Sequence, residues 1–284
     1  SSPLYHVSGL SQISDISKRG RISRSMGFHN AFGSVGSTIG LVTLTVSLST
    51  LGWRWTYLSW AVPILAWGLV LLRSPKPETI AYEKRPTKKI KGLARLCLVF
   101  STGFLVFLAV IGFREVGVSG SLTFMTTYLV GMRGLSEATA AAIFGLGPFV
   151  GIVGSVGGGY LGEKTGAKRA LSLTIIGCVI SLSVLAFLSD WYLLVITYVF
   201  FAFFINTAWA PMNSIVADTA PQTEKGLSFS VFSLAEGIVA SITPIMFAAI
   251  IGLLEIWYIF PVSIVFLAAS LITLQFLPHT RIQL

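Results

Sequence analysis

Charged residues are scarce in this sequence. Asp, Glu, Lys and Arg together make up 11% of the 284 residues, less than half of the roughly 25% that soluble globular domains carry. Acidic residues are the scarcest, because 11 Asp and Glu stand against 20 Lys and Arg, which gives a net charge of +9. With 54% hydrophobic residues and a mean hydropathy of +0.81, the composition excludes an ordinary soluble domain and predicts a membrane protein.

Cysteine and histidine are also rare. Cys97 and Cys178 lie at or within apolar segments, so the pattern does not indicate a disulfide framework. His6, His29 and His279 are too far apart in the sequence to predict a metal cluster. No Ser-His-Asp order, paired-cysteine motif or phosphate-binding loop stands out. We therefore expect neither an enzyme nor a bound metal or cofactor.

The sequence contains long runs of apolar residues with few charges. A bilayer core of ~30 Å requires a helix of ~20 apolar residues. Eight such spans are predicted, at roughly 27–50, 55–72, 100–130, 138–160, 170–188, 192–212, 228–251 and 257–277. Away from the N-terminus, the extended polar region is Arg73 to Arg95. The predicted fold is all-α, a polytopic membrane protein with about eight transmembrane helices.

The basic residues orient these spans. Of the 20 Lys and Arg, 17 fall on the N-terminal stretch, the C-terminal tail and every second loop. Arg54 and Arg133 fall on the other side, and Arg114 lies inside a span. Because basic loops stay in the cytoplasm, both termini are predicted to be cytoplasmic in a plasma or inner membrane. Cytoplasmic loops near anionic lipid account for the positive charge, so no nucleic-acid partner is expected.

One short charged loop carries a recognisable signature. Residues 159–171 read GYLGEKTGAKRAL, between two apolar spans. The loop resembles the one that joins the second and third helices of each half in the major facilitator superfamily of transporters. The resemblance is carried by Gly159, Leu161, Gly162, Gly166 and Lys168, with Arg169 as the second base of a pair. Glu163 stands where that family usually has Asp, Lys164 where it usually has Arg, and Ala167 where a base is common.

The resemblance implies a role for this loop. In the family, such loops hold the cytoplasmic side of the transporter shut and part as the two halves rock. Glu163 is expected to rest against the positive N-terminus of a helix in the other half, which would begin near Gly27. We refer to Gly159, Gly162, Glu163, Gly166, Lys168 and Arg169 as the latch loop.

An internal repeat suggests which part of a transporter is present. Phe28 and Gly36 recur as Phe229 and Gly237, an offset of 201 residues in both cases. Parallel halves are the plan of the superfamily. The predicted division is residues 1–72 as helices five and six with the preceding cytoplasmic loop, 73–95 as a basic linker, and 96–284 as the six-helix second half. Helices one to three and most of helix four would then precede Ser1. The alternative is a natural eight-helix protein.

Two further patterns bear on the direction of transport. Drug:proton antiporters of the superfamily carry a helix-five glycine pattern, whose spacing Gly27, Gly36 and Gly40 match, whereas Leu41 replaces its proline. The run Tyr5–Val7, followed by Arg24–Asn30, resembles the branch that contains the fosmidomycin resistance exporter, which usually has proline in place of Val7. Leu44 and Thr45 replace the final glycine pair of the helix-five pattern, so that match is partial. The two patterns favour export, and the missing residues leave uptake as the alternative.

Charges inside apolar spans are the first candidates for function. A charge at the bilayer centre costs ~2.5–3.5 kcal/mol on insertion scales, so it normally faces protein or water and has a partner. Arg114 can hold an anionic substrate or neutralise a carboxylate, and Glu115 can carry a proton. Glu236 is the preferred proton-coupling candidate, because a carboxyl group removed from water is easier to protonate. For each residue, a structural ion pair or helix contact is the alternative.

Polar residues at helical spacing are the second set of candidates. Asn206 and Trp209 are three residues apart and share a helix face, so Asn206 is expected to line a central cavity. His29 and Asn30 lie one turn inside the first span. His29 can titrate near neutral pH, although a histidine satisfied at the interface is the alternative.

Glycines four apart predict close helix packing, namely Gly36 with Gly40, Gly147 with Gly151, and Gly154 with Gly158.

The sequence therefore predicts a secondary transporter that moves a small organic solute by alternating access. Export coupled to protons is favoured, and a monomer in contact with membrane lipid is expected. Proton-coupled uptake remains an alternative, as does a non-transporting scaffold or receptor relative. A membrane-embedded enzyme would need a pair of catalytic groups that is not evident.

Overall fold

The structure is a computed structural model and describes residues 3–17, 21–73, 98–221 and 223–278. The prediction of an all-α protein is confirmed, because the regular elements of the described residues are helices. They are α1 (Pro3–Ile16), α2 (Ile22–Arg73), α4 (Thr102–Gly131), α5 (Glu137–Thr165), α6 (Ala167–Phe187), α7 (Trp191–Thr207), α8 (Trp209–Thr219), α9 (Lys225–Leu253), the 3₁₀ turn η1 (Ile256–Tyr258) and α10 (Ile259–Gln275). The polar stretch at 74–95 and Cys97 lie outside the described residues.

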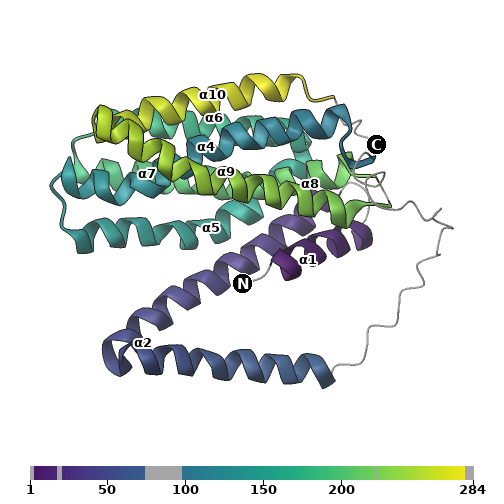
Figure 1. Ribbon diagram of the computed structural model, residues 1–284, viewed down its shortest axis with the longest axis horizontal. Coiled ribbons are helices and arrows are strands. Elements are labelled where there is room, and N and C mark those ends of the chain that lie inside the picture. The colour runs from purple at the N-terminus through teal and green to yellow at the C-terminus, as the bar shows by residue number, and fades with distance from the viewer. Residues whose placement is uncertain (1–2, 18–20, 74–97, 222, 279–284) are drawn as a thin grey trace.

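Seven helices of the described residues are long and apolar enough to cross a membrane. Eight spans were predicted, and the one at 55–72 is helical but is not among the seven. It forms the second arm of α2, which turns back at Gly52, where φ is 72°. Figure 1 shows the first arm of α2 starting beside α5 and running to this kink, and the second arm lying apart from the bundle of α4 to α10.

Residues 3–16, which were predicted to lie in the cytoplasmic loop before the first span, form the helix α1. This segment is too short to span a bilayer, and the sequence gives it no long apolar run. The structure shows that α1 packs against α9 and α2, with Leu10 fully buried and Ser14 nearly so. Tertiary contact therefore stabilises a helix that composition alone did not indicate.

The predicted span at 192–212 is also divided. α7 ends at Thr207 and α8 begins at Trp209, although together they make one candidate membrane span. Pro211 has no N–H to donate to the carbonyl of Thr207, which interrupts the regular helix. At the break, the backbone N–H of Ala208 donates to the carbonyl oxygens of Phe204 and Ile205, at 3.2 and 3.3 Å.

Glycines allow close packing at several crossings. A methyl group on Gly154 would lie 2.9 Å from the carbonyl oxygen of Phe203, and one on Gly158 would overlap the backbone of Thr207. The prediction of close packing is confirmed at these two positions. It is wrong at Gly36, which has no atom within 4 Å of such a methyl group. Gly120 receives the ring of Phe247, which brings α9 against α4.

Candidate functional site

A cavity of about 380 Å³ lies between the first arm of α2 and the helices α5, α7 and α8. Four of the predicted site residues line it, namely His29, Asn30, Asn206 and Trp209. The remaining lining residues are Phe32, Gly33, Ser34, Ser37 and Ser155. The structure therefore brings together residues that are far apart in the sequence, and Asn206 is one of them.

Asn206 lies in the last turn of α7, just before the break to α8. Its Nδ2 donates to the carbonyl oxygen of Ala202 at 2.8 Å, one turn earlier in α7. In the described residues its Oδ1 accepts no hydrogen bond and lies beside Gly151 of α5. Trp209 follows on the other side of the break, at the start of α8. The cavity wall therefore presents an amide oxygen beside an indole ring.

The lining serines are the part of the site that sequence reasoning missed. Asn30, Ser34 and Ser37 follow one another at helical spacings of four and three, so they share one face of α2. That spacing is the pattern from which the polar face of α2 could have been predicted. Serine in a membrane helix often bonds its own backbone, as Ser37 does to the carbonyl of Gly33 at 3.1 Å, so its presence alone does not indicate a site.

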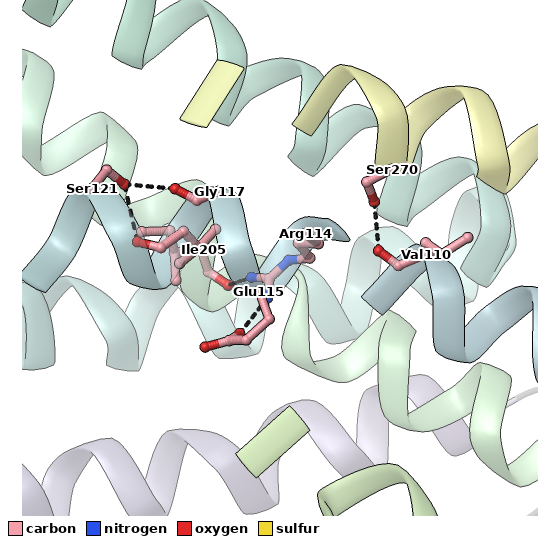
Figure 2. Close-up of polar contacts among 8 residues, drawn as sticks. Val110, Arg114, Glu115, Gly117, Ser121, Ile205 and Ser270 are labelled. Carbon is pink, nitrogen blue, oxygen red and sulfur yellow. Dashed lines mark hydrogen bonds and ion pairs between the residues drawn. The ribbon is translucent and has the colours of Figure 1, made fainter. Parts of the chain in front are cut away.

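The three charged candidates form a second cluster, on α4 and α9. The Arg114 side chain is 1% exposed, and its Nη1 lies 3.8 Å from Oε2 of Glu115, whose side chain is 13% exposed. Arg114 Nη2 also donates to the carbonyl oxygen of Ile205 at 3.1 Å (Figure 2). Arg114 thus contacts both its sequence neighbour and the C-terminal end of α7, where a cation is favoured.

Glu236 of α9 joins this cluster. It interacts electrostatically with both Glu115 and Arg114. Its Oε1 is buried and has no hydrogen-bond partner in the described residues. Two carboxyl groups and one guanidinium therefore share one buried region. None of these three residues lines the cavity, but Arg114 reaches the residue that precedes Asn206.

The latch loop lies at another part of the molecule, where the end of α5 meets the start of α2. A methyl group on Gly159 would lie 3.0 Å from Cα of Arg24 and 3.2 Å from Cα of Gly27, and one on Gly162 would overlap Ser23. The guanidinium of Arg24 donates to the Tyr160 hydroxyl at 2.7 Å and covers its ring at 4.4 Å. The two helices are therefore in close contact at this end.

The charged residues of the latch loop differ in their contacts, because Lys168 is hydrogen-bonded and the other two are exposed. Lys168 donates from Nζ to the carbonyl oxygens of Gln275 and Leu277, at 3.0 and 2.6 Å, which joins the start of α6 to the end of α10. Glu163 and Arg169 are exposed. Gly166 forms the turn between α5 and α6 with φ of 85°, a conformation that favours glycine.

A second contact at this end was not predicted. Lys225, the first residue of α9, lies 2.9 Å from Oδ1 of Asp15 and donates to the carbonyl oxygen of Ser14 at 3.3 Å. Lys225 is 8% exposed and Asp15 is 26% exposed. This ion pair joins α1 to α9. No pattern in the sequence indicates this ion pair, because the stretch around Asp15 was expected to be a loop.

Comparison with known proteins gives concordant matches. The Major Facilitator Superfamily model matches residues 2–244 and 156–283. The probable galactarate/D-glucarate transporter GudP of Escherichia coli (strain K12) is 29% identical over 141 residues, which cover 46% of this chain and 31% of that relative. The matched region is therefore less than a third of the relative's length.

Solved structures share the fold. The E. coli fucose:proton symporter FucP superposes with a TM-score of 0.74 at 15% identity, covering 97% of this chain and 73% of that one. The proton:xylose symporter XylE gives a TM-score of 0.73 at 13% identity, covering 95% and 67%. A bacterial homologue of the iron transporter ferroportin, in an outward-facing state, gives a TM-score of 0.69 at 15% identity. The superposition covers 96% of this chain and 68% of that one. At these identities the likeness concerns the fold alone.

Proposed function

The chain belongs to the major facilitator superfamily and is a multi-pass membrane protein, and on that premise we propose that the protein is a proton-coupled secondary transporter of a small organic solute. The solute binds in the cavity between α2, α5, α7 and α8. The two halves rock about this cavity and expose it to each side of the membrane in turn. Residues 1–72 form the end of the first half, 73–95 a linker, and 96–284 the second half.

The observation that carries proton coupling is the buried cluster of Arg114, Glu115 and Glu236. With both carboxyl groups ionised, the cluster holds one negative charge more than its guanidinium balances. An unbalanced charge within a membrane is costly, whereas binding of one proton makes the cluster neutral. Glu236 is the proposed proton carrier, since its Oε1 is buried without a hydrogen bond to any described residue.

The cluster and the cavity are joined through one residue. Arg114 donates to the carbonyl of Ile205, and Asn206 is the next residue along α7. A proton that arrives at or leaves the cluster changes how strongly Arg114 is held by the carboxylates. That change reaches the cavity wall through the end of α7. Coupling of this kind needs no direct contact between proton and solute.

The proposed direction is uptake. Two solved structures with this fold are, by name, proton symporters, one of fucose and one of xylose. The export expectation rests on Gly27, Gly36 and Gly40 and on the runs Tyr5–Val7 and Arg24–Asn30, and the comparisons lend it no support. We propose that both ends of the chain face the cytoplasm, following the distribution of Lys and Arg.

Proton movement in proteoliposomes tests this function. The full-length protein is reconstituted with a pH-sensitive dye inside, and uncharged sugars and sugar acids are added outside one at a time. We expect acidification of the lumen with at least one solute and none in protein-free vesicles. A flat response to the whole panel would contradict proton-coupled transport and favour the scaffold alternative.

A further inference from the structure

Gly151 lies directly behind two polar side chains of the cavity wall, those of Ser34 and Asn206. A methyl group on Gly151 would lie 2.9 Å from Oδ1 of Asn206 and 3.0 Å from Oγ of Ser34. Both distances are shorter than ordinary carbon–oxygen contact, so a side chain at this position would displace at least one of the two groups. Gly151 is buried in α5, Asn206 belongs to α7 and Ser34 to α2. Three helices thus meet here because one of them has no side chain.

The two polar groups beside Gly151 are free to bind a ligand. Asn206 uses its Nδ2 within α7, while its Oδ1 accepts no hydrogen bond from any residue that the structure describes. The Ser34 hydroxyl likewise makes no hydrogen bond to the described part of the chain. Asn30, one turn earlier on the same face of α2, has a buried Nδ2 without a partner. Within the described ranges, the cavity therefore has unpaired hydrogen-bonding groups from α2 on one side and from α7 on the other.

The rest of the lining indicates the class of ligand. Apart from His29, the lining side chains carry no ionisable group, and Trp209 and Phe32 supply aromatic surface. The nearby cations are directed elsewhere, since Arg114 contacts Glu115 and Ile205, and Arg24 contacts Tyr160. Among the residues that the structure describes, a carboxylate ligand would have no fixed positive partner in this lining. Hydroxyl groups match the amide and serine groups, and the CH face of a sugar ring matches the aromatic surface.

We propose that Gly151 is the specificity-determining residue of this site, setting the size limit for an uncharged, hydroxyl-bearing solute held between Ser34 and Asn206. The proposal rests on the transport function above, because it names the substrate class of the same cavity. An added methyl group at Gly151 displaces Asn206 or Ser34, and a side chain pushed toward the cavity occupies space that a larger sugar needs. A smaller sugar keeps its contacts to both side chains.

Equilibrium binding of radiolabelled sugars to the detergent-solubilised full-length protein tests this. The probes are D-xylose, D-glucose, which adds one hydroxymethyl group, and D-glucarate, which carries two carboxylates. Wild-type protein should bind both neutral sugars at least about tenfold more tightly than D-glucarate. Gly151→Ala should weaken D-glucose binding by roughly tenfold or more and D-xylose binding by less than about threefold.

Gly145→Ala is the matched control on the same helix, because no atom lies within 4 Å of a methyl group there. It should leave all three affinities unchanged. Ser34→Ala is the second variant, used because it adds no bulk and cannot disturb packing as Gly151→Ala can. It should weaken both neutral sugars about fivefold, the effect of one lost hydrogen bond.

Several outcomes would overturn the proposal. These are tightest binding of D-glucarate, absence of binding of all three probes, equal effects of Gly151→Ala on the two neutral sugars, and unchanged sugar binding in Ser34→Ala. Binding is measured without a pH gradient. The expected binding pattern together with a flat proton signal would therefore contradict the transport function and leave the site assignment in place.

Discussion

Arg114 joins α4 to the end of α7, because its Nη2 donates to the carbonyl oxygen of Ile205 at 3.1 Å. That carbonyl belongs to the last turn before the helix break at Ala208. The same guanidinium lies 3.8 Å from Glu115. One buried cation therefore connects the carboxyl cluster to the helix end that carries Asn206, which is the physical basis of the proposed coupling.

Removal of this cation should destabilise the protein. Arg114→Gln leaves Glu115 and Glu236 without their positive partner in a buried region, and loss of one partner of a buried pair costs about 3–5 kcal/mol. The free energy of unfolding, from denaturant titration in detergent, is the measurement. Arg54→Gln is the control, since Arg54 is exposed and its loss should stay within about 0.5 kcal/mol.

The double variant Arg114→Gln/Glu115→Gln sharpens that test. If the destabilisation arises from an unbalanced carboxylate, the second change should recover part of the lost stability. A double variant no more stable than Arg114→Gln would show that the hydrogen bond to Ile205, and not charge balance, accounts for the effect.

The pair Lys225–Asp15 should hold α1 against α9. In Lys225→Met the ion pair and the hydrogen bond to Ser14 are both lost, so the two helices should separate in more of the molecules. A loss of ~1 kcal/mol corresponds to a roughly fivefold rise in the separated population. Spin-label distances between α1 and α9 measure this. Lys164→Met is the control, because Lys164 is exposed. Equal distance distributions in both variants would contradict the role of the pair.

The latch loop makes a separate prediction. Glu163→Gln removes the carboxylate expected to rest against the positive N-terminus of α2, and should favour the conformer that is open to the cytoplasm. Spin labels on the start of α2 and the end of α5 report the change. Glu163 is exposed and has no hydrogen bond or ion pair to a described residue, so the interaction is expected to be modest. An unchanged conformer distribution would count against the latch.

Orientation can be tested by accessibility labelling. Single cysteines at Lys88 and Arg169, in a background without Cys97 and Cys178, should react with a membrane-impermeant reagent from the cytoplasmic side. A cysteine at Met132, which is 43% exposed and follows the end of α4, should react from the other side. Reaction of Lys88 and Arg169 from opposite sides would contradict an even number of crossings between them.

Much of the fold could be predicted because apolar length is a local property. The spans at 100–130, 138–160, 170–188, 228–251 and 257–277 each correspond to a helix of the structure. α1 could not be predicted, because its stability comes from contact with α9 and not from its own composition. The break at Ala208 was missed although Pro211 gave a local signal for it.

The site was predictable in part for the same physical reason. Charges within apolar spans are conspicuous, so Arg114, Glu115 and Glu236 were found from the sequence. Their association was not, because it depends on how α4 and α9 pack. Ser34 and Ser155 were missed because serine is common in membrane helices. Gly151 was recognised as a packing residue, and its contact with two cavity side chains required the structure.

The proton-coupling claim is tested most directly with Glu236→Gln in proteoliposomes, by comparing uptake driven by a pH gradient with counterflow exchange of the same sugar. A glutamine cannot carry the proton, so gradient-driven uptake should be lost while exchange, which needs no net proton movement, continues. Uptake that still follows the pH gradient in Glu236→Gln would contradict the account. Loss of both activities would also contradict it and assign Glu236 to folding or solute binding.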